Sequence, residues 1–157
     1  MRKVVANTTP LIALADIGQL ELLHHLYGEI LIPAAVMDEI ESEPARTLVT
    51  NADWIKQISI NDPERKILFK ARLHAGEVEV ILLAEDEKAD LVIMDDNSAK
   101  KTAKYLGLNV TGTLGILLKA KQTGKIQTVK PLIQQLIDNG LYVDEQTRQM
   151  VLKHAGE

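Results

Sequence analysis

The clearest strand signal in the sequence is Leu91-Val92-Ile93-Met94, an unbroken apolar run that ends at Asp95-Asp96. Helical patterns flank this run on both sides, near residues 76–88 and 97–106. A strand that is apolar on both faces and alternates with helices is typical of a parallel sheet covered by helices on both sides. The stretch therefore predicts the α/β fold class, as a three-layer α/β/α domain.

The rest of the chain continues this alternation. Short apolar runs predict four further strands, at residues 3–6, 29–32, 54–60 and 109–111, of which 54–60 alternates like an edge strand. Helical patterns are expected at residues 10–26 (with a break at Gly18), 33–42, 44–51, 64–73, 113–122, 129–139 and 144–154. Because 157 residues is an ordinary length for one domain, we expect a single domain over residues 1–157.

The composition excludes several classes of protein. The chain has no cysteine, which excludes disulfide scaffolds, thiolate zinc sites and cysteine nucleophiles. Its formal net charge of −4 argues against a broad phosphate-binding surface. The first residues turn polar too early for a signal peptide, and no apolar run approaches the ~20 residues of a membrane span. We expect a soluble, cytoplasmic protein that does not bind membranes.

Polar residues follow two of the predicted strands. The first strand is followed by Asn7-Thr8-Thr9, and the fourth by Asp95-Asp96. Ligands of open parallel sheets bind beyond the carboxyl ends of the strands, where these residues lie. Residues of the same types also cap helices, so either segment alone is compatible with both roles.

Glu77 carries a second signal, because its helix places it among apolar residues. Val80 and Ile81 lie three and four positions later, on the same face as Glu77. Glu79 and Glu85 fall nearer the outer face and are expected to be solvated. A carboxylate that faces a core costs on the order of several kcal/mol without compensation. Glu77 is therefore expected either at the rim of the core or beside a cation.

The helix expected over residues 33–42 adds a further acidic candidate. It turns Val36 and Ile40 inward, and Glu39 and Glu41 border that face on opposite sides. Periodicity does not choose between these two glutamates, and an acidic helix surface is itself ordinary.

Together these positions suggest a cluster of Asn7, Glu39, Glu77 and Asp95. Oxygen ligands without cysteine or ordered histidines suit a hard divalent cation such as Mg²⁺ or Mn²⁺. The histidines show no spacing typical of a metal site: His24, His25, His74 and His154. Such a cation could orient a water and neutralise a scissile phosphate.

Four stretches, in this order, resemble the motifs of PIN-domain proteins: Val5–Ile12, Ile32–Ile40, Gly76–Ala84 and Leu91–Asp96. The segments Gly112–Leu117 and Lys153–Glu157 are similar to a VapC-like branch of prokaryotic PIN-like proteins. The superfamily resemblance extends to about Leu118, so residues 119–157 are interpreted as a helical C-terminal extension.

The resemblance implies a five-stranded parallel sheet of order 3-2-1-4-5, in which the first and fourth strands are neighbours. It also implies an Mg²⁺- or Mn²⁺-dependent endoribonuclease, often the toxin of a toxin–antitoxin pair. The acidic positions of the family fall on Asn7, Glu39, Glu77 and Asp95, with Asp96 as a second ligand or as the cap of the next helix. Thr8 and Thr9 match a small polar position after the first acidic residue, where their hydroxyls would contact that residue or a metal-bound water, or cap the helix.

Two positions depart from the family pattern. Asn7 stands where aspartate is normal, and Glu77 stands where aspartate is usual. An amide oxygen still ligates a cation but brings no negative charge, so a catalytically weak or inactive binding module is the alternative to the nuclease. A receiver-like phosphoacceptor domain is disfavoured, because its acidic pair would follow the first strand.

Substrate and partner candidates are fewer. Lys100 and Lys104 share a helix face after Asp96 and either hold RNA phosphates or form a solvated face. Aromatic residues make up only 3% of the chain, so no base-stacking platform is expected and RNA affinity should be modest. Apolar positions in the C-terminal helices either complete the core or form a homodimer or antitoxin surface: Leu132, Ile133, Leu136, Ile137, Leu141, Val143, Met150, Val151 and Leu152.

Overall fold

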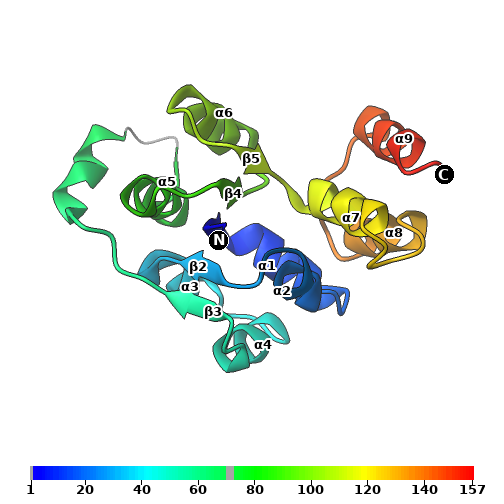
Figure 1. The fold of residues 1–157 in the computed structure, drawn as a ribbon, viewed down its shortest axis with the longest axis horizontal. Coiled ribbons are helices and arrows are strands. Elements are labelled where there is room, and N and C mark those ends of the chain that lie inside the picture. The colour runs from blue at the N-terminus through cyan, green and yellow to red at the C-terminus, as the bar shows by residue number, and fades with distance from the viewer. Residues whose placement is uncertain (1, 70–72) are drawn as a thin grey trace.

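The structure is a computed structural model that describes residues 2–69 and 73–157. Its five strands form one parallel sheet in the order β3-β2-β1-β4-β5, which confirms the predicted 3-2-1-4-5 order and the α/β fold class. The strands are β1 (Val4–Ala6), β2 (Ile30–Ile32), β3 (Ile55–Gln57), β4 (Leu91–Ile93) and β5 (Val110–Thr111). Helices surround the sheet (Figure 1).

Apart from the segment 64–73, the helices lie where the sequence pattern predicts them, and most are shorter than predicted. They are α1 (Thr8–Asp16), α2 (Glu21–Tyr27), α3 (Ala34–Glu39), α4 (Ala45–Asn51), the 3-10 helix η1 (Pro63–Leu68), α5 (Ala75–Glu87), α6 (Asn97–Tyr105), α7 (Thr113–Gln122), α8 (Lys130–Asp138) and α9 (Glu145–His154). The break between α1 and α2 falls at Gly18, as predicted, where φ is +70°.

The largest difference from the expected elements is the segment 64–73. An α-helix was expected there, but the structure has the short η1, and residues 70–72 of that expectation lie outside the described part of the chain. No residue of η1 is buried, and Ile67 and Leu68 are 85% and 76% exposed. Most helical stability comes from packing of an apolar face, and this segment packs too little of its surface to extend as an α-helix.

The neighbouring strands β1 and β4 place distant parts of the chain side by side. Val4, Val5 and Ala6 of β1 pair in register with Leu91, Val92 and Ile93 of β4. Side chains on both faces of β1 are fully buried, which explains the unbroken apolar runs. Since both strands end together, the residues that follow them begin at the same edge of the sheet.

The C-terminal helices α7, α8 and α9 form a group beside α1 and α2, at the yellow-to-red end of the ribbon (Figure 1). Ile133, Leu136 and Leu152 are buried in the common core. The apolar residues of the C-terminal helices therefore complete the core, which was one of the two interpretations of their pattern. Met150 is exposed instead. No helix in residues 2–69 and 73–157 combines the length and apolar character that a bilayer crossing needs.

Candidate functional site

Asn7 lies at the carboxyl end of β1 and is 95% buried, since its exposed fraction is 5%. Its backbone N–H donates to the carbonyl of Ile93 across the sheet at 2.8 Å, which fixes it beside the end of β4. Its side-chain Oδ1 is buried without a hydrogen-bond partner, the one such side-chain atom in the described part of the chain. Buried acceptors are normally paired, so this oxygen lacks the hydrogen bond that its burial requires.

Glu39, at the end of α3, is held by residues from two other motifs. The Thr8 hydroxyl donates to Glu39 Oε2 at 2.9 Å, and the Gly76 N–H donates to Oε1 at 2.9 Å. A Cβ atom on Gly76 would lie only 2.6 Å from that Oε1, so a larger residue there would have to displace the Glu39 carboxylate. The structure thereby places Glu39 at this edge, whereas Glu41 lines a separate hollow beside Arg46.

Glu77 lies in the first turn of α5 and is only 5% exposed. Its Oε1 accepts the N–H of His74 at 2.9 Å, so part of the compensation that burial requires comes from the start of its own helix. Burial raises the pKa of the Glu77 carboxyl, and the charges of Asp96 and Glu39 raise it further against the opposing His74 hydrogen bond. The carboxylates of Asp96 and Glu39, which come from two other segments, therefore lie within electrostatic range of Glu77.

Glu79 was expected to be solvated, and that expectation is wrong. It is 9% exposed, its Oε1 accepts the N–H of Ala35 at 3.1 Å, and its Oε2 binds Lys66 Nζ at 2.6 Å. The helical period of α5 could not show this, because α5 is covered by the sheet on one side and by α3 and η1 elsewhere. Glu79 joins three elements and has a structural role.

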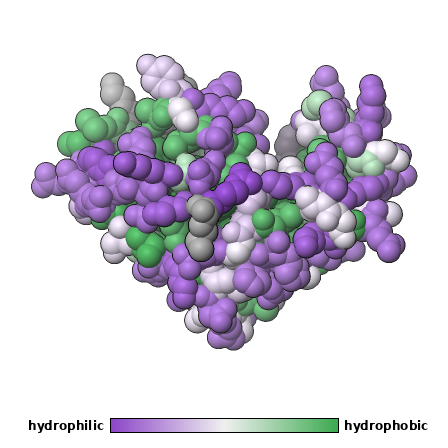
Figure 2. Space-filling model, viewed as in Figure 1, coloured by the Kyte–Doolittle hydropathy of each residue, from purple (hydrophilic) through white to green (hydrophobic). Residues whose placement is uncertain are grey.

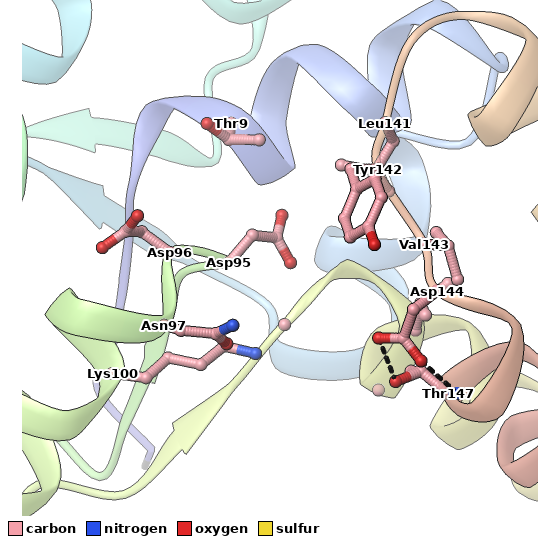
Figure 3. A pocket seen from close by; sticks show the side chains of 13 residues that line it. Thr9, Asp95, Asp96, Asn97, Lys100, Leu141, Tyr142, Val143, Asp144 and Thr147 are labelled. Atoms are coloured by element: carbon pink, nitrogen blue, oxygen red, sulfur yellow. Dashed lines mark hydrogen bonds between the residues drawn. The ribbon is translucent and has the colours of Figure 1, made fainter.

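The two aspartates after β4 point to different sides (Figure 3). Both oxygens of Asp95 are held by Thr113, through its N–H at 2.8 Å and its hydroxyl at 2.6 Å. Asp96 caps α6 by accepting the N–H of Ala99 at 2.9 Å, which is one of the two roles foreseen for it. Asp96 is the one whose charge acts on Glu77.

Thr113 was not identified as a site residue from the sequence. It is fully buried and follows β5, the neighbour of β4 in the sheet. Once the strand order is known, a polar residue at the end of β5 is expected beside those that follow β4. The signal therefore lies in the topology rather than in the local sequence.

A cleft of about 500 Å³ opens beside Asp95 (Figure 3). One side is formed by the start of α6 and by residues that follow β5, and the other by the segment between α8 and α9 with Thr147 of α9. Thr9, Asp96, Asn97, Lys100 and Gly112 are among the lining residues. A Cβ on Gly112 would lie 2.7 Å from Asp95 Oδ1 and 3.0 Å from Lys100 Nζ, so these two groups converge over the glycine.

The remaining candidate residues differ in whether they line this cleft. Thr9 is exposed and lines it, whereas Thr8 is buried against Glu39. Lys100 points into it, but Lys104 is exposed and is not among the residues that line it. Of the two lysines predicted to face the substrate, only Lys100 therefore lines the cleft within the described part of the chain.

The candidate metal ligands at this edge of the sheet are all oxygen atoms. Carboxylates of Glu39, Glu77 and Asp96 and the free amide oxygen of Asn7 are hard ligands of the kind that Mg²⁺ and Mn²⁺ take. Within the described ranges, no three side chains of histidine, cysteine, aspartate or glutamate form a group that could hold a metal ion as they are placed. A cation here would rely on a mixed set of amide and carboxylate oxygens.

Comparison with known proteins adds one finding. The family model of DUF3368, described as a PIN domain, matches residues 3–157, which is nearly the whole chain. No curated protein matches the sequence.

Proposed function

The chain belongs to the PIN-domain family, whose members are generally nucleases, and from that premise we propose that it is an Mg²⁺- or Mn²⁺-dependent endoribonuclease. The observation that carries the proposal is the meeting of four family motifs at one edge of the sheet. Hydrogen bonds join Glu39 to Thr8 and Gly76, and the charges of Glu39 and Asp96 act on Glu77. The Asn7 backbone is bonded to Ile93 at the end of β4, the strand that Asp96 follows.

The proposed metal ligands are Asn7, Glu39, Glu77, Asp95 and Asp96. A bound divalent cation supplies an activated water and offsets the charge of the scissile phosphate. The chain's own groups position these ligands: Thr8 and Gly76 fix the Glu39 carboxylate, and Thr113 fixes that of Asp95. Burial, and to a smaller extent the charges of Asp96 and Glu39, raise the pKa of Glu77, and a bound cation would offset both effects.

The proposed substrate contact is Lys100, since Lys104 does not line the cleft. Lys100 is the cationic side chain among the described residues that line the cleft, and no acidic side chain in that part of the chain forms a salt bridge with it. It is therefore free to bind a phosphate beside the scissile bond. Thr9, exposed at the same cleft, is placed to contact the substrate or a water there.

The decisive experiment is RNA cleavage by purified protein with Mn²⁺. We expect the wild type to cleave and the double variant Glu77→Ala/Asp95→Ala to lose at least about 100-fold in rate. A matched control, Asp38→Ala/Glu85→Ala, removes two exposed carboxylates and the same formal charge. If the first double variant cleaves as fast as the wild type, the activity belongs to a contaminant and the proposal fails.

A second candidate function is a PIN-like binding module without turnover. Asn7 favours it, because the amide brings no charge to a position where the family has aspartate, and so does the absence of a ready metal-holding group among the described residues. Calorimetric titration of the wild type with Mn²⁺ separates the two candidates. Micromolar or tighter binding supports the enzyme, whereas no measurable heat supports the binding module.

The physiological part of the proposal is a toxin of a toxin–antitoxin pair, acting on RNA in the cytoplasm as a homodimer. It rests on the resemblance of Gly112–Leu117 and Lys153–Glu157 to the VapC-like branch. Expression in a bacterial host should arrest growth, and the Glu77→Ala/Asp95→Ala variant should not. Co-expression of the neighbouring small open reading frame should restore growth, and light scattering of the purified chain should give twice the mass of one chain.

A further inference from the structure

We propose that Tyr142 is a stacking platform for one unpaired RNA base, placed by the C-terminal helices opposite the acidic residues. The inference rests on the proposed ribonuclease function and names how that site takes its substrate. Figure 3 shows the Tyr142 ring projecting from the segment between α8 and α9 into the cleft that Asp95 and Lys100 also line.

The exposure of this ring is imposed by ordered neighbours on both sides. Tyr142 is 87% exposed. Leu141, before it, packs against the core and donates its N–H to the Leu136 carbonyl at 3.0 Å. Asp144, after it, caps α9 through two hydrogen bonds from Thr147, at 2.8 and 2.9 Å. The ordered neighbours therefore leave the Tyr142 ring exposed on the wall of the cleft, where a planar group could stack on it.

The charges along the cleft indicate which part of a nucleotide lies where. Lys100 and the sheet-edge carboxylates are on one side, where a phosphate and its cation would bind. Asp144 lies next to Tyr142 on the other side, and its negative charge disfavours a phosphate there. A neutral base suits the Tyr142 side, because stacking on an aromatic ring needs no charge.

The substrate is then single-stranded at this position. A base in a duplex is stacked between its neighbours and cannot lie flat on a protein ring, whereas an unpaired base can. The cleft of about 500 Å³ lies within the roughly 300–1,000 Å³ typical of small-molecule sites, which suits an individual nucleotide rather than a helix. The low aromatic content of the sequence predicted no stacking platform, but one correctly placed ring is enough for one base.

The test is binding of a short single-stranded RNA that carries 2-aminopurine, with Ca²⁺ in place of Mg²⁺ and Mn²⁺ and the RNA checked afterwards for cleavage. Stacking on a ring quenches the fluorescence of this base. We expect quenching by the wild type, and binding by Tyr142→Ala that is about 5- to 150-fold weaker with the quenching lost. Tyr142→Phe and Tyr142→Trp should bind and quench like the wild type, and all three variants should melt at the wild-type temperature.

The matched control is Tyr105→Ala. Tyr105 is 90% exposed but lines a different hollow, with Leu68 and Leu106, so its loss should leave binding unchanged. A duplex of the same sequence should bind weakly and show no dependence on Tyr142. The inference is overturned if Tyr142→Ala binds as tightly as the wild type, if Tyr105→Ala weakens binding equally, or if the wild type does not bind single-stranded RNA.

These outcomes are distinct from failure of the proposed function. Wild-type cleavage with Mn²⁺ that is indifferent to Tyr142 leaves the ribonuclease and removes the platform. Binding with quenching but no cleavage with either metal leaves the platform and removes the ribonuclease.

Discussion

At the scale of single residues, Asn7 is the position at which the proposed metal site can be tested most directly. Its Oδ1 is buried and unpaired within the described part of the chain, and buried positions of this kind carry a cost of about 1–3 kcal/mol unless a partner binds. The amide oxygen can ligate a cation but cannot offset its charge. In the proposed site we therefore expect Asn7 to hold a cation more weakly than an aspartate would.

The substitution Asn7→Asp should tighten Mn²⁺ binding at least about tenfold, because the added charge lies at a buried ligand position. In EDTA the same variant should melt below the wild type, since a buried carboxylate then lacks a partner. Calorimetry and thermal melting measure the two effects. The control Asn51→Asp changes an exposed asparagine beside Trp54 and should alter neither the Mn²⁺ affinity nor the melting temperature. Unchanged Mn²⁺ affinity in a folded Asn7→Asp protein would contradict the proposal that Asn7 is a metal ligand.

Thr113 provides a second residue-scale prediction. Thr113→Val keeps the shape of the side chain and removes the hydroxyl that donates to Asp95, in a fully buried position. We expect it to lower the free energy of unfolding by about 1–3 kcal/mol.

Thr47→Val is its matched control, because Thr47 also donates its N–H and hydroxyl to one carboxylate, that of Glu43, but in an exposed setting. That change should cost less than about 0.5 kcal/mol. Urea unfolding of both variants compares the two sites. Equal losses would show that the Asp95–Thr113 pair is no better ordered than a surface pair.

At the scale of elements, Glu79 connects α5 to α3 and η1. Glu79→Ala removes the acceptor of Ala35 N–H and the partner of Lys66. We expect a loss of about 1–3 kcal/mol, which corresponds to a melting temperature lower by roughly 2–12 °C for a chain of this size. Differential scanning calorimetry measures it. Glu85→Ala, an exposed position on the same helix, should shift the melting temperature by far less; similar shifts would mean that helix propensity alone accounts for the effect.

The elements also show what the sequence alone predicts. Apolar runs and helix boundaries follow from local patterns, so the strands and the break at Gly18 were predictable. The strand order was not, because it depends on pairings between distant residues such as Val5 with Leu31 and with Val92. That order came from the family resemblance. Helical periodicity also failed for Glu79, since it describes one helix and not what packs around it.

At the scale of the whole molecule, the same distinction applies to the candidate site. Residues at strand ends were found from the sequence because chain position alone places them at the sheet edge. The contacts of Glu39 with Thr8 and Gly76 could not be foreseen, since they join three elements that only the fold brings together. Tyr142 is more remote still: it reaches the cleft through the packing of α7, α8 and α9.

The packing of these C-terminal helices leads to a prediction about pH. The Glu157 carboxylate accepts from Lys121 Nζ at 2.9 Å and from the N–H groups of Val129 and Lys130 at 2.7 and 3.1 Å, so it joins α7 to the start of α8. The Lys121 hydrogen bond, followed by that of Val129, lowers the pKa of Glu157 from 4.5 to about 2. Because the pKa is lower in the folded state, the ionised carboxylate stabilises the protein above about pH 4.5, and this stabilisation is lost as the pH falls toward 2.

Glu157→Gln should therefore unfold at a lower urea concentration than the wild type at pH 7, and the difference should shrink progressively below pH 4.5. Urea midpoints across this pH range measure it. Glu145→Gln is the control. The Glu145 side chain is 67% exposed and lies 3.5 Å from the Arg148 guanidinium, and exposed ion pairs of this kind contribute little to the free energy of unfolding. If the wild-type and Glu157→Gln curves run parallel through the acid range, the carboxylate does not hold the C-terminal helices together. Tyr142 would then have to owe its position to apolar packing alone.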